Sequence, residues 1–168
     1  MRYILSLIVE NKHGVLAKVA QVVTGRGYNI STLTVGPSER ADTSRMIITF
    51  DSDEKIIEQI IKQMNKLVDV IKIFLIDDNE KVERELLLVR ISRKKDNEES
   101  IERIVKIFRG KIVDVTMKSF VIEITGASRK IDSFVENIKS YGIQDLMRTG
   151  PLALPRFDMR TNTKEQIK

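Results

Sequence analysis

The order of strand-forming and helix-forming segments constrains this chain more than any single motif, because the same order occurs twice. Residues 3–76 read as strand, helix, strand, strand, helix, strand, and residues 86–147 repeat that order. A β-α-β-β-α-β order is typical of the ferredoxin-like split motif, in which two helices cover one face of an antiparallel sheet. The sequence therefore predicts an α+β protein with two ferredoxin-like βαββαβ domains in tandem.

The first copy opens with the run Tyr3–Val9, which is too apolar to be exposed on either face. A helix follows, because apolar residues recur at the spacing of a 3.6-residue turn. These residues are Val15, Leu16, Val19, Val22 and Val23. Gly27 then stands where a C-cap glycine of this helix is expected.

The rest of the first copy supplies three strands and one helix. Strands are predicted at residues 30–35, 46–50 and 70–76. Before the last strand, Ser52-Asp53 can cap a second helix. Its apolar stripe consists of Ile56, Ile57, Ile60, Ile61 and Met64.

The second copy has the same plan with little sequence identity to the first. Strands are predicted at 86–91, 111–115, 120–124 and 143–147, the middle two forming a hairpin around Met117-Lys118. Two helices have the spacing i, i+3, i+4, i+7. Their apolar residues are Ile101, Ile104, Val105 and Phe108, then Ile131, Phe134, Val135 and Ile138.

These elements divide the chain into two domains and two connecting segments. The first domain takes residues 1–76 and the second takes residues 84–150. Residues 77–83 lose the periodicity and are expected to form a linker. Residues 151–168 are expected to be a loose tail, within which Leu152 to Leu154 could dock.

Composition excludes several classes of function. The chain has no Cys, so it has no disulfide and no thiolate metal site, which fits a reducing cytoplasm. No signal peptide or membrane span is expected, because no apolar run is long enough. The net charge of +5 is spread over 29 basic and 24 acidic residues, scattered among one another. This mixture favours a solvated surface over a nucleic-acid-binding patch.

The turn between the first strand and the first helix is the best candidate for a binding site. It reads Asn11-Lys12-His13-Gly14-Val15-Leu16, and a glycine turn at a helix start leaves backbone N–H groups free to hold a carboxylate. Asn11, together with Asn29 in the stretch Gly27-Tyr28-Asn29-Ile30, adds amides that donate or accept. We expect both amides near one sheet edge, where a small zwitterion is held. The alternative is a structural turn with no ligand.

Other candidate sites are weaker. His13 is the single histidine and has no paired carboxylate or second histidine nearby in sequence, so we predict neither metal binding nor acid–base catalysis. Gly25-Arg26-Gly27 follows a helix, where the helix dipole disfavours a phosphate. The strands lack the stacked aromatics of RNA-binding sheets. No catalytic residue is predicted.

Several motifs resemble those of the ACT domain, and more narrowly the regulatory (small) subunit of acetohydroxyacid synthase, also called acetolactate synthase. The resemblance spans about residues 2–156. In the first domain it rests on the Asn11–Leu16 turn, Arg26–Ile30, Leu33–Gly36 and Ser44–Met46. In the second it rests on Arg84–Leu86, Phe108–Val115 and Arg148–Gly150.

The resemblance implies a non-catalytic subunit. Such a subunit binds and activates a separate catalytic subunit, which holds thiamine diphosphate, magnesium and FAD, and it transmits feedback inhibition by a branched-chain amino acid, with valine as the default. The reaction makes acetolactate and acetohydroxybutyrate for valine, leucine and isoleucine synthesis. No cofactor is then expected in this chain.

The resemblance also implies where the effector sits, namely between two ACT domains of a homodimer. Asn11, His13, Gly14, Val15 and Leu16 of one protomer would face Asn29 and Ile30 of the other. We expect the N–H groups of residues 14–16 to hold the carboxylate and Asn11 or Asn29 to accept from the ammonium. The second strand would be an exposed edge that pairs with its copy.

Two other hypotheses remain at this stage. A free-standing amino-acid sensor of transcription would need a DNA-binding motif or basic arm, and the sequence shows neither. A small ferredoxin-like enzyme would need an acid, base or nucleophile constellation, which the sequence also does not show. The second domain favours the regulatory subunit, because it has no place in either alternative.

Overall fold

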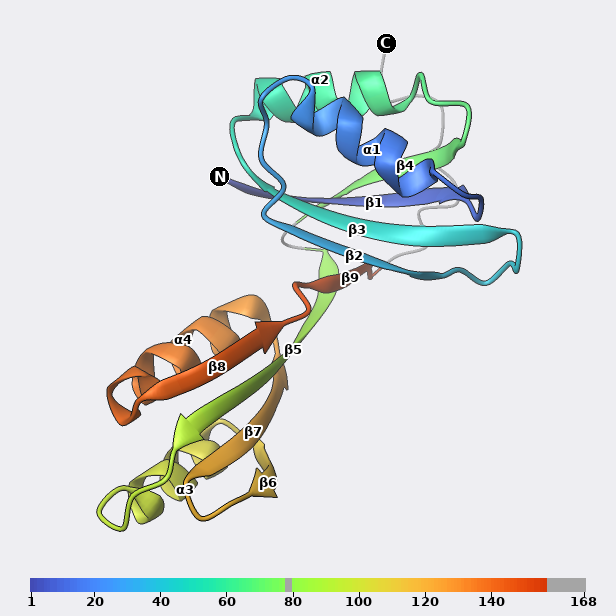
Figure 1. Cartoon of the computed structure of the whole chain (residues 1–168). Coiled ribbons are helices and arrows are strands. Elements are labelled where there is room, and N and C mark those ends of the chain that lie inside the picture. The colour runs from blue at the N-terminus through green and yellow to red at the C-terminus, as the bar shows by residue number, and fades with distance from the viewer. Residues whose placement is uncertain (78–79, 157–168) are drawn as a thin grey trace. The chain divides into compact units, whose positions relative to one another are not determined.

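The computed structural model describes residues 1–77 and 80–156, which form two units (Figure 1). Of the residues described, those up to Val82 and residues 153–156 belong to the first unit, and Glu83–Leu152 form the second. Each unit has its own sheet, helices and hydrophobic core. Within the described residues, no helix is both long and apolar enough to cross a membrane.

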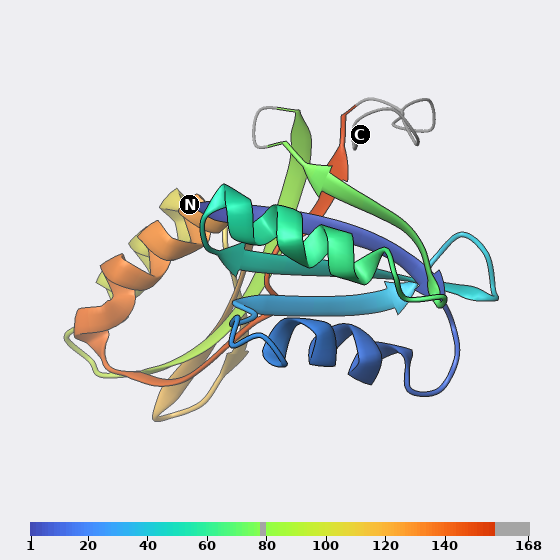
Figure 2. The ribbon, with the colours of Figure 1, turned by 90° about the horizontal axis from the view of Figure 1, so that it is seen from above.

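The first unit has a four-stranded antiparallel sheet with the order β2-β3-β1-β4. Its elements are β1 (Arg2–Glu10), α1 (Val15–Thr24), β2 (Thr32–Pro37), β3 (Thr43–Asp51), α2 (Glu54–Met64) and β4 (Val70–Ile76). Figure 2, which looks onto the helices, shows α1 and α2 side by side over the sheet. The predicted ferredoxin-like α+β architecture is confirmed.

Strand β1 is central and is buried on both faces, as its apolar sequence predicts. Leu5, Leu7 and Val9 point toward the helices and belong to the main core. Ile4 points to the opposite face, where it forms a second small cluster with Ile47, Ile76 and Ala153, each at most 5% exposed. A single strand therefore supplies side chains to two cores.

The second unit repeats the topology, with the sheet order β6-β7-β5-β8. Its elements are β5 (Lys81–Ser92), α3 (Glu98–Ile107), β6 (Lys111–Val115), β7 (Ser119–Gly126), α4 (Ser128–Ile138), the 3-10 helix η1 (Lys139–Tyr141) and β8 (Ile143–Arg148). Its core centres on Leu87, Val89 and Ile91 of β5. Phe108 and Phe134 meet edge to face, with ring centroids 5.3 Å apart.

The two connecting segments differ from expectation. Lys81–Glu83, expected in the linker, are the first residues of β5. Leu152–Pro155, expected in the tail, form the strand β9, which pairs with β5. Ala153 of β9 is buried. Leu152–Pro155 are therefore packed against the protein, and are not part of a loose tail. Residues 78–79 and 157–168 lie outside the described residues.

Two predicted caps also differ. Helix α1 ends earlier than predicted, with Gly25 at its C-cap, and Gly27 takes a left-handed φ of 74° two residues later. Asp53 is the N-cap residue of α2, but its side chain makes no capping hydrogen bond within the described chain. Acidic charge at the helix start, from Asp53 and Glu54, remains favourable to the helix dipole.

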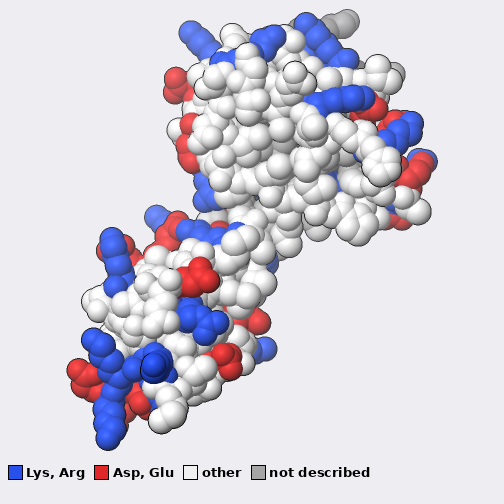
Figure 3. Space-filling view, in the orientation of Figure 1, with Lys and Arg blue, Asp and Glu red and all other residues white. Residues whose placement is uncertain are grey.

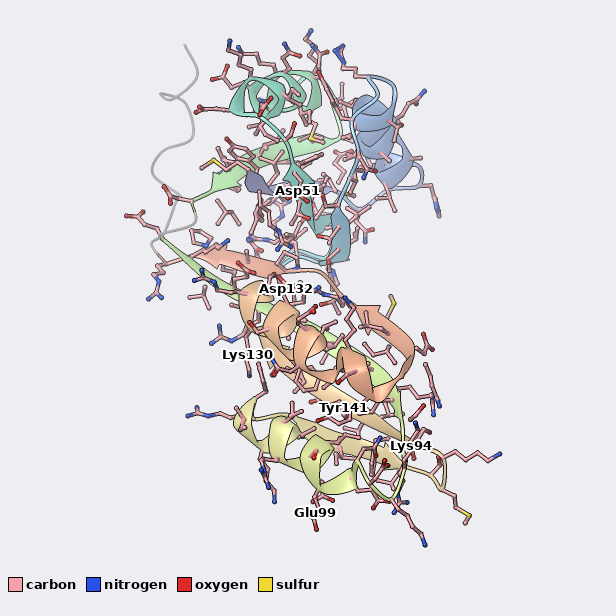
Figure 4. The ribbon with its side chains drawn as sticks, turned by 90° about the vertical axis from the view of Figure 1, so that its left-hand side faces the viewer. Asp51, Lys94, Glu99, Lys130, Asp132 and Tyr141 are labelled. Carbon is pink, nitrogen blue, oxygen red and sulfur yellow. The ribbon has the colours of Figure 1, made fainter. Side chains whose placement is uncertain are left out.

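A partly buried ion pair joins β5 and β8, and a further bond from the same arginine reaches α4. Arg148 Nε donates to Glu85 Oε1 at 2.6 Å, and Arg148 Nη2 donates to Glu85 Oε2 at 3.0 Å. The Glu85 side chain is 1% exposed. Arg148 Nη1 donates to Asp132 at 2.7 Å, and Figure 4 shows Asp132 near the start of α4. Hydrogen bonds to Glu85 are the main reason that the pKa of Arg148 is raised above its ordinary value.

Arg148→Met is expected to lower the free energy of unfolding by about 3 kcal/mol, because it leaves the buried Glu85 carboxylate without its cationic partner. Urea denaturation measures the change. Arg129→Met is the matched control, because Arg129 lies exposed on α4. Equal midpoints for the two variants would show that the Glu85–Arg148 pair does not support the second unit.

Candidate ligand site

The turn between β1 and α1 has the geometry that ligand binding through backbone groups requires. Gly14 is the N-cap residue of α1 and adopts the left-handed conformation, with φ 82°. A Cβ at this position would meet no described atom within 4 Å, so the space beside it is open. Asn11, Lys12 and His13 are all exposed. The backbone of the turn is thus accessible from solvent.

The first turn of α1 presents N–H groups to this open space. The first helical hydrogen bond runs from Lys18 N–H to the carbonyl of Gly14, at 3.0 Å. Leu16 and Ala17 precede it, so their N–H groups have no acceptor within the helix. Val15 N–H makes only a long bond, 3.4 Å, to the carbonyl of Lys12. These donors and the helix dipole favour an anionic group at this end.

Two lysines flank the turn. Lys12 Nζ lies 2.7 Å from Glu10 Oε2, and Lys18 Nζ lies 2.6 Å from Asp69 Oδ2. The hydrogen bond and charge of Glu10 raise the pKa of Lys12 above its ordinary value. The Lys18–Asp69 pair also ties α1 to the segment before β4. Each cation is thus paired with a carboxylate, so the helix start itself, and not the lysines, supplies the attraction for an anionic group.

The structure does not bring Asn11 and Asn29 together within one chain. The Asn11–Leu16 turn lies at the N-terminal end of α1, whereas Asn29 and Ile30 follow its C-terminal end. A helix of 10 residues separates the two ends by about 15 Å. The expectation that both amides lie near one sheet edge is therefore wrong for a single chain, because α1 spans the sheet between them.

Strand β2 is an outer strand of the first sheet, as predicted. Ser38 N–H donates to the carbonyl of Thr43 at 3.2 Å, and this pair continues the β2–β3 register. Since hydrogen-bonded pairs alternate in an antiparallel ladder, the backbone groups of Leu33 and Val35 point away from β3. Edge groups of this kind are available to a further strand.

A shallow open groove of about 310 Å³ lies elsewhere on the first unit. Its lining comes from the C-terminal half of α1, the residues just after it and α2, and consists of Gln21, Val22, Gly25, Arg26 and Gln63. None of these residues belongs to the predicted site. Helix carbonyls, not N–H groups, point toward this end of α1, so the groove is less suited to a carboxylate.

The equivalent turn in the second unit is filled by its own side chains. Asn97, at the N-cap of α3, accepts from Lys94 N–H through Oδ1 and donates to the carbonyl of Ser92 through Nδ2. Glu98 and Glu99 occupy the first turn, and Arg93 pairs with Glu98. Acidic side chains at a helix start disfavour an anion there. Among the residues described, only the first unit thus has a helix start without acidic side chains in the first turn after its first strand.

Sequence analysis missed the residues that surround the turn. Lys12 stood inside the motif but was given no role, and neither Lys18 nor Asp69 was considered. The sequence could have drawn attention to Lys18, because it is the one charged residue in the otherwise uncharged helix α1. The residues described contain no group of three or more His, Asp or Glu placed to hold a metal ion.

Comparisons with known proteins agree with these features in both units. Residues 5–72 match the family model of the acetohydroxyacid synthase small subunit-like ACT domain, and residues 84–157 match that of the small subunit of acetolactate synthase. The first unit is thus an ACT domain. The chain belongs to the acetolactate synthase small subunit family.

Individual relatives align over nearly their whole length. The probable acetolactate synthase small subunit of Archaeoglobus fulgidus is 46% identical, over 93% of this chain and 98% of the relative. The acetolactate synthase isozyme 3 small subunit of Escherichia coli is 40% identical, over 94% and 98%. The crystal structure of the acetolactate synthase small subunit from Thermotoga maritima matches with a TM-score of 0.86 and 42% identity, covering 94% of this chain and 99% of that one.

Gly14→Ala is expected to lower the free energy of unfolding by about 1 kcal/mol, because a Cβ strains the left-handed conformation. Gly14→Asn should cost less, since Asn tolerates that region. Gly36→Ala is the control, because Gly36 also has open space around it but lacks a positive φ. Equal effects of the two alanine variants in urea denaturation would contradict the role of backbone conformation at Gly14.

Proposed function

We propose that this chain is the non-catalytic regulatory subunit that binds and activates the catalytic subunit of acetolactate synthase in the cytoplasm. It also confers feedback inhibition by a branched-chain amino acid, with valine the first candidate. The observation that carries the regulatory role is the open start of α1 behind Gly14. The thiamine diphosphate, magnesium and FAD belong to the catalytic partner, and this chain supplies the effector site.

The effector's carboxylate binds at the start of α1. Sequence analysis assigned it to the N–H groups of Gly14, Val15 and Leu16. The first-turn geometry adds Ala17 as a fourth donor, since its N–H also precedes the first helical hydrogen bond. His13 and Asn11 border this space from the exposed side of the turn. The ammonium is held by an amide oxygen of Asn11 or Asn29, which closes the site over a zwitterion.

Asn29 and Ile30 reach this site from a second chain. Two β2 strands that pair about a two-fold axis run antiparallel, so the start of one strand lies beside the end of the other. Pro37, at the end of β2, is paired with Ser44 of β3, which is paired in turn with Val9 of β1. Val9 lies two residues before the Asn11–Leu16 turn, so the end of β2 and this turn lie at the same end of the sheet. The partner subunit's Asn29 and the partner subunit's Ile30 come just before the start of its β2. In the antiparallel pair they therefore approach the end of the sheet that carries the Asn11–Leu16 turn.

The surface of α1 supports the same dimer. Leu16 is 43% exposed, and the neighbouring outward residues Ala17, Gln21 and Thr24 are uncharged. Figure 3 shows the face of the first unit that carries α1 and β2 as mostly uncharged, with Lys, Arg, Asp and Glu gathered toward its margins. A low density of charge beside an available strand edge fits a protein–protein contact.

Inhibition follows if the effector stabilises one arrangement of this dimer. A ligand that contacts two protomers favours the arrangement in which it makes the better contacts with both. A coupling free energy of about 1–3 kcal/mol between effector binding and that arrangement is sufficient for useful regulation. Valine, leucine and isoleucine differ by about one methylene, which limits discrimination to about 1–3 kcal/mol. The preferred effector is therefore set by the packing around Ile30 and Leu16.

Gly14→Asp is expected to weaken valine binding at least about tenfold more than Gly14→Asn does, because the added carboxylate repels that of the effector. Calorimetric titration with valine, leucine and isoleucine measures the affinities. Asp and Asn have the same shape and both tolerate a left-handed φ, so the comparison isolates charge. Equal affinities in the two variants would exclude this helix start as the carboxylate site.

Val35→Lys is expected to convert the dimer into a monomer at low micromolar concentration, because a charged lysine on the edge strand opposes pairing. Sedimentation velocity reports the change in mass. Val68→Lys is the control, since Val68 is 94% exposed and lies away from β2. A dimer that persists in the Val35 variant would place the interface on another surface.

A further inference from the structure

The segment Thr149–Pro155, here termed the return strap, is anchored at both of its ends. At its start, Thr149 N–H donates to the carbonyl of Leu86 at 3.1 Å, and Leu86 N–H donates to Thr149 Oγ1 at 3.1 Å. The preceding residue is Arg148, which is fixed by Glu85 and Asp132. The start of the strap is therefore bound to β5 and, through Arg148, to α4 of the second unit.

The other end of the return strap belongs to the first unit. Ala153 is 3% exposed and completes the cluster of Ile4, Ile47 and Ile76 on the face of the sheet opposite the helices. Arg156 N–H donates to the carbonyl of Glu80 at 2.8 Å, which holds the chain just after the strap. The first unit thus depends on a segment that follows the second unit in sequence.

The strap is short. Thr149 and Ala153 are four residues apart, so their Cα atoms can separate by at most about 14 Å. Gly150 uses a left-handed φ of 74°, and Pro151, which is buried, has a restricted φ. A displacement of the Ile4–Ile47–Ile76 surface larger than the chain allows must therefore move Thr149 or release Ala153.

The residues under the strap lie on the strands that build the effector site. Ile4 is on β1, whose far end leads into the Gly14 turn. Ile47 is on β3 and is paired with Ser6 of β1 and with Thr34 of the edge strand β2. A change in the twist of β1, β2 and β3 when a ligand bridges two protomers would therefore reach the contact with Ala153 directly.

We propose that the return strap couples occupancy of the effector site to the second unit. It does so by connecting the Ile4–Ile47–Ile76 surface to the ion pairs that Arg148 makes with Glu85 and Asp132. This inference rests on the proposed effector function. The strap is a mechanical connection and is not part of the effector site. Breaking it should leave valine binding intact and remove the response of the second unit.

The decisive variant is Ala153→Glu, which places a carboxylate in an apolar cluster and so releases the strap. Leu154→Glu is the matched control, because Leu154 is the next residue on β9 and is 54% exposed. Each full-length variant is titrated with valine by calorimetry and then assayed as a holoenzyme with its catalytic subunit. Hydrogen exchange with and without valine is followed in β5, β8 and α4.

The Ala153→Glu variant should bind valine within about twofold of the wild type, but its half-inhibitory valine concentration should rise at least about tenfold. The effect of valine on exchange in β5, β8 and α4 should also disappear. Leu154→Glu should behave as the wild type in all three measurements. Equal inhibition and equal exchange in the two variants would overturn the coupling role.

A second variant tests the other anchor and covers the case in which Ala153→Glu fails to fold. Thr149→Val removes the hydroxyl acceptor of Leu86 N–H while it keeps the side-chain shape. It should reproduce the loss of inhibition with valine binding retained, and unchanged inhibition would count against the strap. If the wild type itself fails to bind valine, the proposed effector function falls, and the strap proposal falls with it.

Discussion

The burial of β1 on both faces is the constraint on which the first unit depends. A central strand with apolar residues at consecutive positions cannot leave either face in water. The helices α1 and α2 cover one face through Leu5, Leu7 and Val9. The other face has no helix among the described residues, and Ala153 of β9 meets that need together with Ile4, Ile47 and Ile76. The first unit is therefore completed by a segment that follows the second unit in sequence.

The same strand also fixes the candidate site. Because β1 ends at Glu10 and α1 must begin over the sheet, the chain reverses within four residues, and the left-handed φ of Gly14 makes the reversal possible. A tight reversal leaves no residues to cover the helix start, so its N–H groups stay exposed. In the second unit the corresponding connection is only one residue longer, and the Asn97 side chain folds back onto it. The residues at the helix start, glycine in α1 and asparagine followed by two glutamates in α3, therefore distinguish the two sites.

Periodicity predicted most of the fold, because strands and helices in this chain bury their apolar residues with clear spacing. Val15, Val19 and Val23 of α1 and Ile131, Phe134 and Ile138 of α4 are buried as their patterns required. The strand β9 could not be predicted in this way. Only Ala153 of its four residues is buried, and its burial depends on Ile4 and Ile47, which are distant in sequence.

The site could be predicted in part. The Gly14 turn was apparent from local chemistry, since a glycine before an apolar helix marks both a turn and a free helix start. The placement of Asn29 was not, because local sequence does not show that α1 spans the sheet between the two amides. The Lys18–Asp69 pair was missed for a similar reason, since its partners are 51 residues apart. Glu85 and Arg148 stood in motifs that carried the family resemblance, but residues 63 positions apart gave no sign that they pair.

The cluster under Ala153 has a consequence for how the protein can be divided. A boundary drawn after residue 82, where the first ferredoxin-like motif is complete, would remove β9 and expose Ile4, Ile47 and Ile76 to water. Those side chains would then form an exposed hydrophobic patch on the sheet, and such a patch promotes aggregation. A fragment that keeps solubility would need a polar replacement at one of these positions or a fused copy of Leu152–Pro155. The self-sufficient unit of this protein is discontinuous in sequence.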